Sequence, residues 1–178
     1  MSKNLADDIL IALRRIIRAI DLYSRRLAQR HGLTVPQLVV LQELRRRGEM
    51  PGSELARAVS LSQATVTGIL SRLAARGLVV RRRSVSDRRR LPVRLTEAGA
   101  ALVAAAPPLL QESFCAELGK LAEWEQTQIL SNLQRLVAMM EAEDVAASPL
   151  LTTEELGAPA TGVALSGEPR PGGGRPPA

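Results

Sequence analysis

The sequence predicts a mainly α-helical fold that carries a small two-stranded β hairpin. Apolar residues make up 46% of the chain but aromatic residues only 2%, so the core must be built from aliphatic side chains, which suit helices. Apolar positions recur at helical spacing through several long stretches. Two short β-branched runs, 78–80 and 91–95, flank a segment rich in arginine. The 178 residues suffice for one compact domain, or for a DNA-binding unit with a dimerisation layer.

The first predicted helix runs from Asn4 to about Arg30, and Gly32 provides a left-handed cap. Its apolar residues repeat at heptad-like spacing over roughly 40 Å, which is further than one small domain can cover. The last predicted helix, from about Ala122 to Asp144, carries a similar seam. We expect both helices to form an isologous homodimer interface. Its predicted residues are Ile9, Leu13, Ile16, Ile20, Ile129, Leu133, Leu136 and Met140.

Between these ends lie three shorter predicted helices. Thr34 and Gln37 form a capping box at the start of the first, which ends near Gly48. The second spans about Pro51 to Val59, and Ser62 caps the third, which runs to about Arg76. In this third helix the inward stripe is Val66, Ile69, Leu70 and Leu73.

The outer face of the Ser62 helix consists of small or hydrogen-bonding residues and has no acidic group. Such a face lets the helix backbone approach the floor of a DNA groove, where polar side chains reach base edges. The side chains placed for this are Gln63, Thr65, Thr67 and Ser71. The alternative is packing against another helix, which small faces also permit.

The predicted hairpin has six arginines among residues 81–90. They would repel one another unless an anion neutralised them, and an arginine-tipped ribbon suits the minor groove of DNA. We expect Asp87 to hold the loop through an ion pair with a neighbouring arginine. A solvated run of charge is the alternative.

These motifs together resemble the MarR (multiple antibiotic resistance regulator) family. The resemblance covers roughly residues 5–145, and its most specific part is Asp87-Arg88-Arg89 followed by Leu95-Thr96-Glu97-Ala98-Gly99. It implies a homodimeric winged helix-turn-helix repressor of transcription, released by a small-molecule ligand, that binds a double-stranded DNA operator. By this resemblance Ser62, Gln63, Thr65, Thr67, Ser71 and Arg72 would contact the major groove. Arg88, Arg89 and Arg90 would contact the minor groove.

Parts of the first helix and the Ser148–Leu151 segment look similar to family members that govern compatible-solute (ectoine) genes, so an osmotic signal is a further expectation. A small-molecule pocket near Tyr23, His31 and Pro36 would lie between the two layers.

The sequence divides into three expected regions. Residues 1–33 and 100–147 form the dimerisation helices, with a break at Pro107-Pro108, and residues 34–99 form the DNA-binding domain. Residues 148–178 contain six glycines and six prolines, a composition that predicts a disordered tail.

Catalysis is disfavoured, because one histidine and one cysteine offer no metal-ligand spacing, no nucleophile elbow and no phosphate loop. We therefore expect no enzyme activity, no metal and no cofactor. The net charge of +6 favours a polyanionic partner or an acidic membrane surface. The lack of a signal peptide or of an apolar run of membrane-spanning length predicts a cytoplasmic protein. Cys115 is expected to be a buried thiol and Trp124 a partly buried anchor. The rival functions are a non-specific architectural nucleic-acid-binding protein and a protein-interaction dimer.

Overall fold

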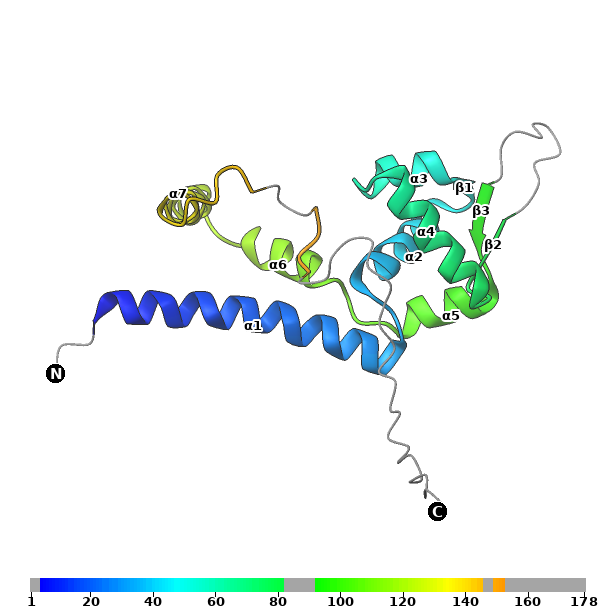
Figure 1. The fold of residues 1–178 in the computed structure, drawn as a ribbon, viewed down its shortest axis with the longest axis horizontal. Helices are drawn as coiled ribbons and strands as arrows, with labels where there is room; N and C mark the ends of the chain where they lie inside the picture. The colour runs from blue at the N-terminus through cyan, green and yellow to red at the C-terminus, as the bar shows by residue number, and fades with distance from the viewer. Residues whose placement is uncertain (1–3, 82–91, 146–148, 153–178) are drawn as a thin grey trace, which may run out of the picture.

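The computed structural model describes residues 4–81, 92–145 and 149–152. Figure 1 shows its elements in chain order. They are α1 (Leu5–His31), α2 (Val35–Arg47), β1 (Met50–Pro51), α3 (Gly52–Ala58), α4 (Gln63–Ala75), β2 (Val79–Arg81), β3 (Pro92–Leu95), α5 (Glu97–Ala105), α6 (Leu110–Leu118) and α7 (Glu123–Met139).

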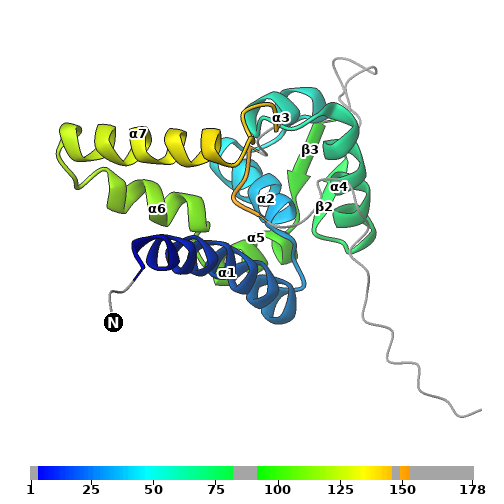
Figure 2. The same ribbon diagram turned by 60° about the vertical axis from the view of Figure 1, so that its left-hand side comes forward.

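The elements form two parts. A body of α2, α3, α4, α5 and the sheet lies at one side, while α1, α6 and α7 extend from it on the other (Figures 1 and 2). The predicted mainly helical fold with a small β element is confirmed.

The ends of the first two helices form where the sequence predicts them. The Asn4 side chain accepts a hydrogen bond from the Ala6 amide at 3.2 Å at the start of α1. Gly32 ends α1 with φ 61°, and its amide donates to the Ala28 carbonyl at 2.9 Å. At the start of α2 the Thr34 amide donates to Gln37 Oε1 at 3.1 Å, which is one half of the expected capping box.

The sheet is antiparallel with strand order β1-β3-β2. Val79 pairs with Leu95 and Arg81 with Val93, as a hairpin requires. The prediction of two strands was incomplete, because Met50 pairs with Val93 on the other edge of β3. Two residues, one of them a proline, are too few to show a strand's alternation.

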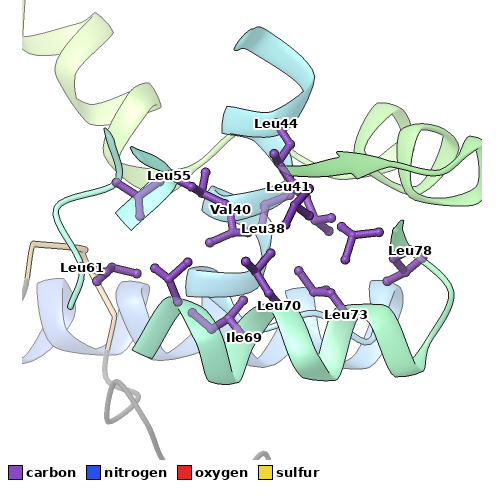
Figure 3. Close-up of a cluster of buried hydrophobic side chains, with 14 of the residues drawn as sticks. Leu38, Val40, Leu41, Leu44, Leu55, Leu61, Ile69, Leu70, Leu73 and Leu78 are labelled. Atoms are coloured by element: carbon purple, nitrogen blue, oxygen red, sulfur yellow. The ribbon is translucent and has the colours of Figure 1, made fainter. Parts of the chain in front are cut away.

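One aliphatic core joins the helix-turn-helix to the sheet. Figure 3 shows leucines of α2 facing leucines and isoleucine of α4, with Leu55 and Leu61 at one end and Leu78 at the other. Leu38, Leu41, Leu55 and Leu73 are 0% exposed. A layer of this kind fixes the face that α4 turns outward, since burying each such side chain contributes about 1.5–3 kcal/mol.

A second group of contacts locks α5 onto the turn that follows α4. The Thr96 hydroxyl donates to the Gly77 carbonyl at 2.7 Å and accepts from the Gly99 amide at 3.0 Å. The Thr96 amide donates to the Leu78 carbonyl at 3.1 Å. A Cβ at Gly99 would overlap that same carbonyl oxygen, so only glycine allows the approach. This explains the leucine-threonine-x-x-glycine pattern without reference to function.

The C-terminal helices are interrupted at Pro107-Pro108, as predicted. α5 ends at Ala105, and α6 begins at Leu110, where Glu112 Oε2 accepts from the Leu109 amide at 3.2 Å. α7 ends at Met139, earlier than the predicted Asp144.

The early end of α7 has a local cause. Glu141 has φ 52°, and the Ala142 amide donates to the Val137 carbonyl at 3.1 Å. A left-handed residue followed by this hydrogen bond is a Schellman closure, here without the usual glycine. Because residues 138–144 include no glycine, the sequence does not indicate that the helix ends here.

The extended helices expose large apolar side chains in the single chain. Among the predicted interface residues, the exposed fractions are Ile9 42%, Ile16 54%, Ile129 37%, Leu133 44% and Met140 67%. Leu13, Ile20 and Leu136 are half-buried. Apolar exposure on this scale marks an interaction surface rather than an ordinary solvated one.

Two expected burials on these helices are wrong for the single chain. Cys115 on α6 is exposed, and Trp124 on α7 is 68% exposed. Both lie on helices that project from the body of the protein (Figure 2). Within the described residues no helix combines the length and apolar character needed to cross a membrane.

Candidate nucleic-acid interface

The candidate interface is the outer face of α4. Its inward stripe is buried as predicted, with Val66, Ile69, Leu70 and Leu73 between 0% and 3% exposed. This stripe points into the core shown in Figure 3. Packing of this stripe in the core therefore holds the opposite face of α4 toward solvent.

The N-terminus of α4 is closed by its own polar side chains. The Ser62 hydroxyl accepts from the Thr65 amide at 3.0 Å and lies 2.7 Å from the Thr65 hydroxyl oxygen. Ser62 is exposed, whereas Thr65 is half-buried. The Ser62–Thr65 pair thus acts first as a helix cap, and any contact with a ligand is additional to that role.

Further along, the exposed face holds Gln63, Thr67, Gly68 and Ser71. The Thr67 hydroxyl donates to the Gln63 carbonyl at 2.7 Å, which leaves its oxygen able to accept one more hydrogen bond. A Cβ at Gly68 would meet no atom within 4 Å. Arg72, also predicted for the site, is half-buried. The helix backbone is therefore open to close approach around Gly68.

A hollow of about 410 Å³ lies beside this face, between α3, α4 and the sheet. Gln63 and Thr67 line it together with Arg57 of α3 and Arg81 of β2. The lining also includes the acidic side chain of Glu54. The structure thus brings two predicted site residues next to two arginines that were not predicted.

Arg57 and Arg81 could not be singled out by motif. Arg57 is one charge on a short helix, and Arg81 opens a run of arginines that drew attention to its centre instead. The sequence did contain an indication of Arg81. It lies two residues after Val79 on the same strand, where the arginine run begins, so both side chains lie on one face of the sheet. The predicted wing residues, Asp87, Arg88, Arg89 and Arg90, lie outside the described residues.

A cleft, here called the α2–α6 cleft, lies between α2 and α6. It has a volume of about 380 Å³. Its lining comes from α2, the end of α3, the start of α6 and the segment after α7: Val39, Ala58, Val59, Ser60, Leu109, Gln111, Glu112, Cys115, Pro149 and Leu150.

Tyr23 joins α1 to the break between α5 and α6. Its hydroxyl donates to the Pro108 carbonyl at 3.0 Å. Burial, and secondly the negative charge of Glu112, raise the pKa of Tyr23 above its ordinary value. The phenol therefore stays protonated and available as a donor.

The chain is similar to known regulators of transcription. The sequence profile of the MarR family matches residues 33–91. The repressor NicR of Pseudomonas putida is 39% identical over 105 residues, which are 59% of this chain and 66% of NicR. The repressor Mb2911 of Mycobacterium bovis is 32% identical over 105 residues, 59% of this chain and 76% of that one.

Among solved structures, BpsR of Bordetella bronchiseptica, whose DNA binding is regulated by 6-hydroxynicotinic acid, is 29% identical. It matches with a TM-score of 0.51 over 76% of this chain and 94% of that one. These likenesses agree with the mostly helical fold and its small antiparallel sheet. The chain belongs to the MarR family of winged-helix, DNA-binding regulators of transcription.

Proposed function

We propose that this chain acts as a homodimeric repressor that reads a pseudo-palindromic operator with α4. The observation that carries the proposal is the polar, acid-free outer face of α4, backed by the fully buried stripe that fixes its direction. Phosphate-only binders need lysine and arginine on such a face, whereas hydroxyl and amide groups read base edges. Gln63, Thr67 and Ser71 are the base-reading residues in this proposal, with Ser62, Thr65 and Arg72 as supporting contacts.

Arginine side chains would supply contacts in addition to those of α4. Arg57 and Arg81 line the hollow beside it and would bind the phosphate backbone. Arg88, Arg89 and Arg90 would enter the minor groove, with Asp87 as their support. Phosphate contacts of this kind fix the register of the helix on DNA but carry no sequence information.

A dimer is needed because one α4 reads too few base pairs for selective binding. The exposed apolar residues of α1, α6 and α7 supply a surface for a second copy. A two-fold axis would hold the two recognition helices about 34 Å apart, one turn of DNA. Relatives named as repressors support the negative sign of regulation.

A small-molecule signal would have room in the α2–α6 cleft, which lies where the extended helices meet the body. BpsR, whose DNA binding responds to 6-hydroxynicotinic acid, supports a ligand-responsive regulator. The predicted likeness to regulators of ectoine genes, and with it an osmotic signal, stays a prediction.

The test is binding of the full chain to DNA from its own upstream region, compared with unrelated DNA of equal length at the same salt concentration. We expect the upstream DNA to bind on the order of a thousandfold more tightly or better. Substituting Thr67 or Ser71 by alanine should reduce this ratio more than it reduces binding to unrelated DNA.

If the chain is instead a non-specific architectural protein, we expect no difference in affinity between the two DNAs. Equal affinity for both DNAs, with the same steep fall as salt rises, would support it. The absence of lysine and the single arginine in α4 speak against this alternative.

A further inference from the structure

The segment after α7 returns to the body of the protein. Residues 149–152, drawn in orange, lie beside the start of α6 in Figure 1 and beside α2 in Figure 2, away from the axis of α7. Leu150 is only 9% exposed and belongs to the main hydrophobic core, whereas the neighbouring Leu151 is 38% exposed. Composition assigns this segment to the tail, so its burial is a departure from expectation.

Leu150 stands at one end of the α2–α6 cleft. Leu150 lines a small space of about 10 Å³ together with Val35, Val39 and Leu109. It also lines the larger α2–α6 cleft, of about 380 Å³, together with Val59 and Cys115. The side chain thus occupies part of an apolar cleft that is otherwise open.

We propose that Pro149–Leu150 is an intramolecular ligand of the α2–α6 cleft, with Leu150 as the docked side chain. The segment belongs to the same chain, so its local concentration is high without any partner. It ties the part of the chain after α7 directly to α2 and α3. The helix that is expected to serve the dimer and the lobe that carries α4 are thereby linked through a contact outside the family motif.

The docking is chemically selective. The cleft offers aliphatic walls, the carboxylate of Glu112 and the amide of Gln111, so a neutral apolar group fits better than an anion. Leucine meets this requirement, whereas an acidic residue in its place would face Glu112. Glu112 also accepts a hydrogen bond from the Leu109 amide and is therefore fixed near the cleft.

The experiment uses the full chain with Leu150→Ser, and Leu151→Ser as the matched control. The neutral dye Nile red reports the vacant cleft, and alkylation of Cys115 reports the place of binding, because Cys115 lines the cleft and is the only cysteine of the chain. We expect Leu150→Ser to bind the dye roughly tenfold more tightly than the unaltered chain, equivalent to about 1.4 kcal/mol. Bound dye should slow the alkylation, and Leu151→Ser should behave like the unaltered chain.

A synthetic peptide of residues 147–153 provides the second arm. Added to Leu150→Ser, it should displace the dye and protect Cys115, while the same peptide with serine in place of leucine at position 150 should do neither. Leu150→Ala, a milder change, is measured in parallel, and circular dichroism checks that each variant is folded.

Equal dye binding in both serine variants, dye binding without protection of Cys115, or failure of the peptide to compete would each overturn the proposal. None of these outcomes affects the proposed DNA-binding function, which is measured separately on the upstream DNA.

Discussion

The side chain of Arg76, at the end of α4, donates a hydrogen bond from Nη1 to the carbonyl oxygen of Gly32, at the end of α1, across 2.5 Å. The two residues are 44 positions apart in the sequence. The positive guanidinium also lies at the negative end of the α1 dipole, where a cation is stabilised. Arg76 therefore joins the helix proposed to read DNA to the helix proposed to form the dimer.

This contact predicts that Arg76 sets the spacing of the two recognition helices. Arg76→Gln should weaken operator binding about three- to tenfold, since a charged hydrogen bond is worth about 1.5–3 kcal/mol before discount for its exposure. It should also reduce the loss of affinity that results from adding or removing one base pair between the half-sites. Fluorescence anisotropy on three operators of different spacing measures both effects.

Arg30→Gln is the control. It removes a positive charge from the last turn of α1, beside Gly32, but leaves the hydrogen bond of Arg76 in place. If Arg76→Gln lost affinity equally at every spacing, as Arg30→Gln should, Arg76 would contribute charge alone.

The close approach of Gly99 to the Leu78 carbonyl predicts a large loss of stability on adding one methyl group. Gly99→Ala would place its Cβ against that oxygen and within 3.3 Å of Leu95 Cδ2. The obstacle is backbone rather than a flexible side chain, so we expect a loss of about 2–4 kcal/mol in the free energy of unfolding. Urea unfolding measures it, and a variant as stable as the unaltered chain would mean that α5 is free to move.

The heptad-like seam of α1 predicts dimerisation through exposed apolar residues. Ile16→Gln together with Leu133→Gln should raise the dimer dissociation constant by a hundredfold or so, because each change removes about 1.5–3 kcal/mol of apolar burial at most. Sedimentation equilibrium measures the constant. Arg14→Gln, exposed and off the seam, is the control and should have little effect. Dimerisation unaffected by the double change would place the interface elsewhere.

The environment of Tyr23 predicts an alkaline titration above the ordinary value of 10.0. Tyr23 is the only tyrosine in the chain, so ultraviolet absorbance follows it without interference. The folded chain holds the phenol protonated more firmly than the unfolded chain. This contribution to stability is therefore complete below pH 10 and is lost as pH rises through the raised pKa of Tyr23.

Glu112→Gln is the control for the cause of this shift. It should bring the midpoint part of the way back, because burial is the larger cause and Glu112 the second. A midpoint at or below 10.0 in the unaltered folded chain would contradict the placement of Tyr23 against Pro108.

The sequence predicted most helix boundaries because they depend on local chemistry. Asn4, Gly32, Gln37, Ser62 and Thr96 each form the capping contact that their residue type favours. The direction of α4 also followed from its apolar spacing, since a stripe at i, i+3, i+4 and i+7 has only one face to bury.

The features that local chemistry does not specify were missed. Met50–Pro51 becomes a strand only because β3 offers it a free edge, and Leu150 is buried only because the α2–α6 cleft receives it. Cys115 was expected to be buried from residue type, but its helix leaves the body. Arg57 joins the candidate site through the packing of α3 beside α4. Each depends on tertiary contacts between distant segments.

The central claim, that the α4 backbone enters a DNA groove, is tested most directly by Gly68→Ala. In the free protein the added methyl group meets no atom within 4 Å, and alanine favours the helix over glycine by about 1 kcal/mol. We expect Gly68→Ala to raise the midpoint of thermal unfolding and to lower operator affinity by about tenfold, because the methyl group would stand between the helix backbone and the base edges. Affinity that stays unchanged or rises along with stability would contradict the claim.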